Sequence, residues 1–165
     1  MRYIGSHPGA YSFRFLMIII LMTALIVFFF NYTDDIAVTT EEASIQQTIN
    51  IINSSMAVIF ASYAVNGQLD RLNELNGGNP FEYMAEFNLV PGGYVGEVEL
   101  GDLANIESGW YFDTLSKKVF YKAFYSSKVF YFALVLKFRD LDGSGRFESA
   151  QDEYQRLYFE QLPQQ

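Results

Sequence analysis

The stretch from Phe15 to Phe30 reads Phe-Leu-Met-Ile-Ile-Ile-Leu-Met-Thr-Ala-Leu-Ile-Val-Phe-Phe-Phe, and it decides the fold. It lies inside an uncharged window, residues 15–33, which is bounded by Arg14 and Asp34. A bilayer core about 30 Å thick needs about 20 helical residues at about 1.5 Å each. Thr23 is the one polar side chain in the run, and its hydroxyl can bond back to the preceding turn. The window therefore predicts a transmembrane helix.

We expect this span to be kept as an anchor. A cleaved signal peptide ends in small residues, whereas this run continues as Phe-Phe-Phe-Asn-Tyr-Thr-Asp-Asp, and no cysteine is there to carry a lipid. Arg2 and Arg14 precede the window without any acid, while all 19 Asp and Glu follow it. Because positive charge stays on the cytoplasmic side, residues 1–14 are predicted to be a cytoplasmic tail. The remainder is predicted to be a periplasmic domain held in a bacterial inner membrane.

The composition excludes several classes of function. The net charge is −8 and the pI is near 4.5, so the chain lacks the clustered basic surface that nucleic-acid binding needs. There is no cysteine, and the one histidine, His7, lies in the predicted tail. Ser-His-Asp triads, Cys-His dyads and histidine zinc sites are therefore excluded from the exported part. Carboxylate pairs such as Asp102 and Glu107, or Asp152 and Glu153, arise by chance in an acidic chain, and we expect no enzyme.

A second long helical element is predicted over residues 34–76. Apolar residues recur at helical spacing from Val38 onward, and Asn76-Gly77-Gly78-Asn79-Pro80 follows as a stop. Thr39 and Glu42 have the spacing of a capping box, so the helix either restarts at Thr39 or continues unbroken from the membrane. The residues expected to face the core are Ile45, Ile49, Ile52, Met56, Ile59 and Tyr63.

The same helix has no charged residue between Ala43 and Leu69. A helix face in contact with solvent normally carries charge. Two interpretations stay open: the helix packs only on its own sheet, or its uncharged polar side also binds a partner helix. The candidate partner-binding residues are Gln46, Gln47, Asn50, Asn53 and Ser54.

Residues 77–165 are predicted to form a small antiparallel sheet. Residues 94–100 form an edge strand or an irregular crossing, and a last strand is expected near 155–159. Between them, three runs rich in aromatic and β-branched residues are separated by short polar turns; they cover 109–113, 119–125 and 128–139. In the longest run, one face is expected to lie on the helix; it consists of Phe130, Phe132, Leu134, Leu136 and Phe138. The predicted fold class is α+β, with an N-terminal transmembrane helix continuing into a long helix packed on a small antiparallel sheet.

Two motifs and the order of the elements point to a known superfamily. The motifs are Gly109-Trp110-Tyr111-Phe112-Asp113 with Val119-Phe120-Tyr121, and Asp140-Leu141-Asp142-Gly143-Ser144-Gly145-Arg146-Phe147. The chain resembles type IV pilins and the pseudopilins of type II secretion. More narrowly, it is similar to the accessory biogenesis proteins of the mannose-sensitive haemagglutinin (MSHA) pilus, of the MshF type. This resemblance implies other pilin-like or pilus-assembly membrane proteins as partners.

One position departs from the pilin pattern. Pilins are cut after a Gly that precedes an apolar segment with Glu as its fifth residue. Here Gly9 is followed by Ala10-Tyr11-Ser12-Phe13-Arg14, so the fifth residue is a cation. The resemblance therefore implies an uncleaved accessory component of pilus assembly rather than a major filament subunit. A pseudopilin-like subunit of type II secretion stays an alternative.

The segment after the longest predicted strand matches the opening of an EF-hand calcium loop. Oxygen-bearing residues occupy its first, third and fifth positions, and Gly145 occupies the sixth. The twelfth position is Gln151 in place of the usual bidentate Glu, which predicts a Kd of about 10⁻⁴ to 10⁻³ M. The candidate ligands are Asp140, Asp142, Ser144, the carbonyl of Arg146, and Glu148.

A glycine turn without metal is the other interpretation of this loop, with Asp142-Gly143 at its tip. If the loop binds calcium, the chain is a calcium-binding periplasmic sensor or binding module. If it does not, the assembly role needs no cofactor.

Overall fold

The computed structural model describes residues 8–99, 105–126 and 128–163. Within them, the helices are α1 (Pro8–Val65), η1 (Leu69–Arg71), α2 (Leu72–Leu75) and α3 (Pro80–Ala85). The strands are β1 (Tyr94–Val98), β2 (Gly109–Asp113), β3 (Lys118–Lys122), β4 (Val129–Arg139) and β5 (Glu153–Gln161). Contacts divide the chain into two units, Met1–Thr40 and Glu41–Gln165, and each is described by itself. The predicted tail up to residue 7, with His7, and Asp102 lie outside the described residues.

The described part of the first unit is α-helical. Its side chains from Phe13 to Phe30 are all exposed, as expected for a helix that meets lipid, and it is long and apolar enough to cross a membrane. Thr23 donates its hydroxyl hydrogen bond to the carbonyl of Ile19 at 2.8 Å, which leaves no unpaired polar hydrogen in the apolar run.

The helix does not restart at Thr39. Its hydroxyl donates to the carbonyl of Asp35 at 2.9 Å, the bond of a residue inside a helix, and so it does not act as an N-cap. Of the two alternatives left open by the sequence, the unbroken helix is the one observed.

The predicted helix boundary at residue 76 is wrong, because α1 ends at Val65. Gly67 has a φ of +66°, which glycine adopts readily. Its N–H donates to the carbonyl of Ala64 at 3.3 Å, and the N–H of Gln68 donates to that of Tyr63 at 2.8 Å. These two bonds form a Schellman motif, which satisfies the last carbonyls and stops the helix.

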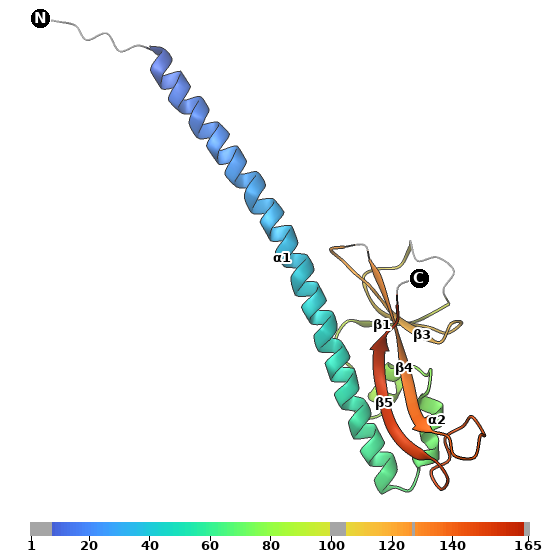
Figure 1. The fold of residues 1–165 in the computed structure, drawn as a ribbon. Coiled ribbons are helices and arrows are strands. Elements are labelled where there is room, and N and C mark those ends of the chain that lie inside the picture. The colour runs from blue at the N-terminus through green and yellow to red at the C-terminus, as the bar shows by residue number, and fades with distance from the viewer. Residues whose placement is uncertain (1–7, 100–104, 127, 164–165) are drawn as a thin grey trace, which may run out of the picture. The chain divides into compact units, whose positions relative to one another are not determined.

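The five strands form one sheet in the order β1-β2-β3-β4-β5 (Figure 1). β2, β3, β4 and β5 pair antiparallel in sequence order, which confirms the predicted meander. β1 pairs with β2 in parallel, so the sheet is mostly rather than wholly antiparallel. β3 stops at Lys122, earlier than predicted, and β5 is longer than predicted.

The core of the second unit lies between α1 and one face of this sheet. All six expected core residues of α1 are buried, and Ile52, Met56 and Ile59 have no exposed surface. The expected face of β4 meets them, with Phe132, Leu134 and Leu136 buried and both flanking phenylalanines partly buried. The predicted α+β class is therefore confirmed. A long apolar N-terminal helix with a five-stranded sheet against it is a pilin-like architecture.

Candidate functional site

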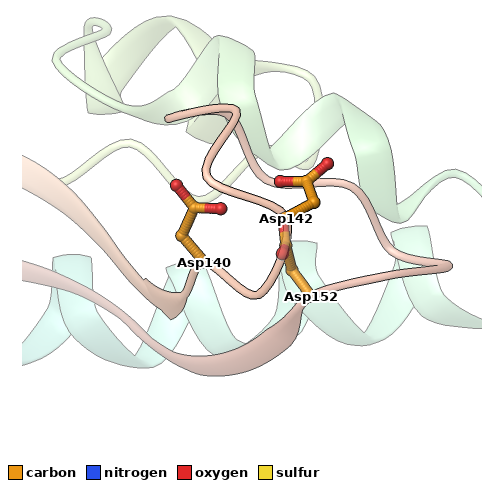
Figure 2. Close-up of side chains that lie close together, drawn as sticks. All are labelled: Asp140, Asp142 and Asp152. Atoms are coloured by element: carbon orange, nitrogen blue, oxygen red, sulfur yellow. The ribbon is translucent and has the colours of Figure 1, made fainter.

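The loop between β4 and β5 gathers three carboxylates, from Asp140, Asp142 and Asp152 (Figure 2). One oxygen from each lies within 4.8 Å of the others, a spacing that a cation can bridge. Asp140 and Asp142 are exposed, and Asp152 is half-buried. This exposed cluster can hold a metal ion.

Backbone hydrogen bonds shape the loop around Asp140. One oxygen of its carboxylate accepts from the N–H of Gly143 at 2.6 Å, and the other accepts from the N–H of Gly145 at 2.8 Å. Both glycines have positive φ, +77° and +72°, which favours glycine at these positions. The bond from Gly145 is the main reason that the pKa of Asp140 lies below its ordinary value. Asp140 is thus a carboxylate at neutral pH.

Asp152 closes the loop from its other end. Its carboxylate accepts from the N–H of Leu141 at 2.9 Å and from the N–H of Glu148 at 2.9 Å. The EF-hand pattern does not include Asp152, which stands one position beyond its twelfth residue. Glu153 begins β5 directly after it, whereas an EF-hand loop leads into a helix.

The other predicted ligands make hydrogen bonds within the loop. Ser144 donates its hydroxyl hydrogen bond to the carbonyl of Arg146 at 2.9 Å, so these two candidate oxygens are bonded to each other. The carboxylate of Glu148 accepts from the side-chain amide of Gln151 at 3.1 Å. Of the three predicted carboxylate ligands, the structure groups Asp140 and Asp142 with Asp152, and Glu148 is outside this group.

The loop is fastened to the helical segment after α1. The side-chain amide of Asn73 donates to the carbonyl of Phe147 at 2.7 Å and accepts from its N–H at 2.9 Å. The N–H of Ser149 donates to Asp70 at 2.8 Å, which lowers the pKa of that carboxyl. Phe147 is itself buried in the core. The loop that carries the three carboxylates is therefore held in place by the folded domain.

Four of the five candidate partner-binding residues of α1 are exposed: Gln46, Gln47, Asn50 and Ser54. Gln46 donates to the side chain of Asn50 at 3.3 Å, so these amides bond within the helix. Asn53 belongs to the other side. Its amide donates to the carbonyl of Phe159 at 3.1 Å and accepts from the N–H of the same residue at 2.8 Å. Asn53 therefore ties α1 to β5.

The exposed side also carries an apolar stripe that the sequence analysis did not select. Ile51, Val58 and Val65 recur every seven residues and are 39%, 52% and 87% exposed. Along the helix, Ile51 follows Asn50, Val58 lies one turn after Ser54, and Val65 lies one turn after Ala61. We call Gln46, Gln47, Asn50, Ile51, Ser54, Val58 and Val65 the uncharged face of α1.

Glu41 forms a third constellation. Only 8% of it is exposed, and its carboxylate accepts three hydrogen bonds. The donors are the hydroxyl of Tyr121 at 2.9 Å, the N–H of Phe124 at 2.6 Å and the N–H of Tyr125 at 3.1 Å. A buried carboxylate needs such donors to offset its lost hydration. Glu41 therefore fixes the turn between β3 and β4 to α1.

The chain matches no family model, no curated protein and no solved structure. What the structure itself supports is the pilin-like architecture, with an N-terminal helix able to act as a membrane anchor.

Proposed function

We propose that the chain is a single-pass inner-membrane accessory component of a type IV, MSHA-like pilus assembly machine. In this proposal its N-terminus is cytoplasmic and its folded domain is periplasmic. The distribution of charge supports that orientation, since Arg2 and Arg14 precede the apolar window and every acid follows it. It acts through protein contacts and not as an enzyme, and its partners are other pilin-like or pilus-assembly membrane proteins.

The observation that carries this proposal is the uncharged face of α1. The helix buries one side in its own sheet, yet its exposed side from residue 43 to the helix end at Val65 carries no charge. A helix side that met only water would gain solubility from charge. A side that packs on another helix avoids charge, because desolvating an unpaired ion costs several kcal/mol. An apolar stripe of period seven, flanked by amides, has the pattern of a helix-packing surface.

Co-purification tests this proposal. The full chain is extracted from membranes in detergent, and the pilin-like proteins retained with it are identified. Lysines placed at both Gln47 and Asn50 are expected to leave the fold intact and to abolish that retention. The matched control places lysines at Leu115 and Leu141, which are exposed and do not belong to α1. Retention by the Gln47/Asn50 variant equal to wild type would remove the uncharged face as the partner surface.

A second candidate function rests on the carboxylate cluster of Asp140, Asp142 and Asp152. We propose that it binds calcium weakly, through hard oxygen ligands, and makes the domain responsive to calcium outside the cytoplasm. Calcium at about ten times Kd would then stabilise the fold by about 1.4 kcal/mol.

The carboxylate cluster includes Asp152, whereas the EF-hand pattern includes Glu148, and thermal unfolding can distinguish the two ligand sets. Asp152→Asn is expected to remove the calcium-induced rise in Tm, because Asp152 lies in the cluster. Glu148→Gln is expected to keep it, because Glu148 does not. The opposite result would favour the EF-hand ligand set, and no rise for the wild-type chain would leave the loop as a turn alone.

A further inference from the structure

The turn between β3 and β4 exposes two large aromatic side chains. Phe124 is 71% exposed and Tyr125 is 58% exposed, and their rings form an edge-to-face pair with centroids 4.9 Å apart. All other aromatic side chains among the described residues of the second unit are buried or partly buried. Two adjacent exposed aromatics form an apolar patch that a solvated turn does not need.

The exposure is built into the fold. The carboxylate of Glu41 accepts from the N–H groups of both Phe124 and Tyr125, at 2.6 and 3.1 Å. Ala123, just before them, is buried, and its N–H donates to the carbonyl of Lys128 at 2.9 Å. The backbone of the turn is therefore held while its two rings are left uncovered.

The chain itself limits how far this turn can be from the predicted span. Eight residues lead from Thr33, the last residue of the uncharged window, to Glu41. Eight residues cover about 12 Å as an α-helix and at most about 28 Å when fully extended. The headgroup region adds about 5 to 8 Å beyond the hydrocarbon on each side of a bilayer. Glu41 bonds the turn directly, so the connecting chain is short enough for the two rings to reach the membrane surface.

The residues of the turn have the chemistry of the membrane interface. Aromatic rings are enriched where hydrocarbon meets headgroups, and tyrosine adds a hydroxyl for the wet side. Lys128 is exposed next to the turn and offers a cation to lipid phosphates. Among the described residues, the acid bonded to the turn is Glu41, which is buried and accepts hydrogen bonds from Tyr121, Phe124 and Tyr125.

We propose that Phe124 and Tyr125 insert into the lipid interface of the same bilayer that holds residues 15–33. This inference rests on the proposed membrane anchoring. It gives the domain a second attachment point, which fixes its orientation on the membrane surface. The occupant proposed for the patch is lipid, because the tether through Glu41 keeps the patch within reach of the membrane.

Quenching by brominated lipid tests this contact. The full chain is reconstituted into phosphatidylethanolamine–phosphatidylglycerol vesicles, with or without bromine near the headgroup end of the acyl chains. Phe124→Trp adds a reporter to Trp110, which is 3% exposed and common to all variants. We expect brominated lipid to remove most of the emission that Phe124→Trp adds. Tyr125→Trp serves as a second reporter if the first variant does not fold.

Leu141→Trp is the matched control. Leu141 is 60% exposed and follows the far end of β4, an eleven-residue strand that starts beside the turn and extends about 35 Å. We expect its added emission to be unaffected by bromine. Equal quenching at both positions would mean that the domain lies on the membrane without a preferred contact, and would overturn the proposal.

Vesicle flotation separates the two levels of inference. A chain that does not float with the vesicles contradicts the membrane anchoring itself. A chain that floats while Phe124→Trp stays unquenched contradicts the lipid contact alone. Emission of Phe124→Trp that shifts with protein density in the vesicle, but not with bromine, would assign the patch to a second copy of the chain.

Discussion

The two sides of α1 between Glu41 and Val65 both carry apolar residues, but only one side is buried. Ile52 and Ile59 have no exposed surface, while Ile51 and Val58, each one residue earlier, are 39% and 52% exposed. Both pairs repeat every seven residues, so the helix carries two apolar stripes and its own sheet covers one of them. An apolar period predicts that a stripe will be covered, but it does not identify what covers it.

The amides of this helix show the same contrast. Asn50 and Asn53 lie one turn apart in the same uncharged run. Asn50 is exposed, whereas Asn53 bonds both the N–H and the carbonyl of Phe159. Residue type does not separate them, because the difference lies in a partner 106 residues away. Three pairs of substitutions test whether the buried and exposed residues of α1 contribute differently to stability.

The largest effect is expected from a charge at Ile52. Ile52→Asp would bury an unpaired carboxylate in the core and cost about 3 to 5 kcal/mol, enough to unfold the domain. Ile51→Asp is expected to change the free energy of unfolding by less than about 1 kcal/mol, since its side chain reaches solvent. Thermal unfolding of the full chain in detergent, followed by Trp110 emission, measures both. Equal losses would show that both stripes are covered by the chain itself.

The second pair separates the two amides. Asn53→Ala leaves two backbone groups of Phe159 without their partner and is expected to cost about 1 to 3 kcal/mol. Asn50→Ala removes a bond within an exposed helix surface and is expected to cost less than about 0.5 kcal/mol. The same unfolding measurement compares them. A large loss of unfolding free energy for Asn50→Ala would mean that Asn50 belongs to the core side of α1 and not to the uncharged face.

Sequence reasoning located the core side of α1 because burial there follows a regular period that starts at Ile45. It also located the β4 face, since alternation along a strand fixes which residues point to the helix. It missed the helix end because Gly67 closes a Schellman motif, while the longer glycine run at residues 76–80 was the stronger pattern. The parallel pairing of β1 was also missed, since alternation along a strand carries no information on the direction of its neighbour.

The functional sites were predicted less completely, for a physical reason. Asp140 and Asp142 belong to a local motif, so their proximity was visible in the sequence. Asp152 joins them because of a turn, and Glu41 meets Tyr121 across 80 residues. No local pattern records such tertiary contacts.

The third pair, and the smallest expected effect, concerns two adjacent acids. Glu41 is buried and bonded to Tyr121, whereas Glu42 is exposed. Burial of Tyr121, together with its hydrogen bond to Glu41, raises the pKa of this tyrosine from 10.0 to about 12. The folded state therefore holds the phenolic proton more tightly than the unfolded state does. The resulting stability is fully present below pH 10 and is lost as the pH rises to about 12.

Tyr121→Phe is expected to cost about 1.5 kcal/mol at neutral pH, through one lost hydrogen bond to a charged group. It should also remove the part of the alkaline loss of stability that falls in this pH window. Glu42→Gln should leave the alkaline profile unchanged, because its carboxylate is not bonded to Tyr121. Unfolding midpoints are measured across the alkaline range for wild type and both variants. They compare the loss of the Glu41–Tyr121 hydrogen bond with the loss of the Glu42 charge. If Glu42→Gln shifted the alkaline profile as much as Tyr121→Phe, the effect would come from general charge and not from the Glu41–Tyr121 bond. The contrast between the buried and exposed sides of α1 would then not include Glu41 and Glu42.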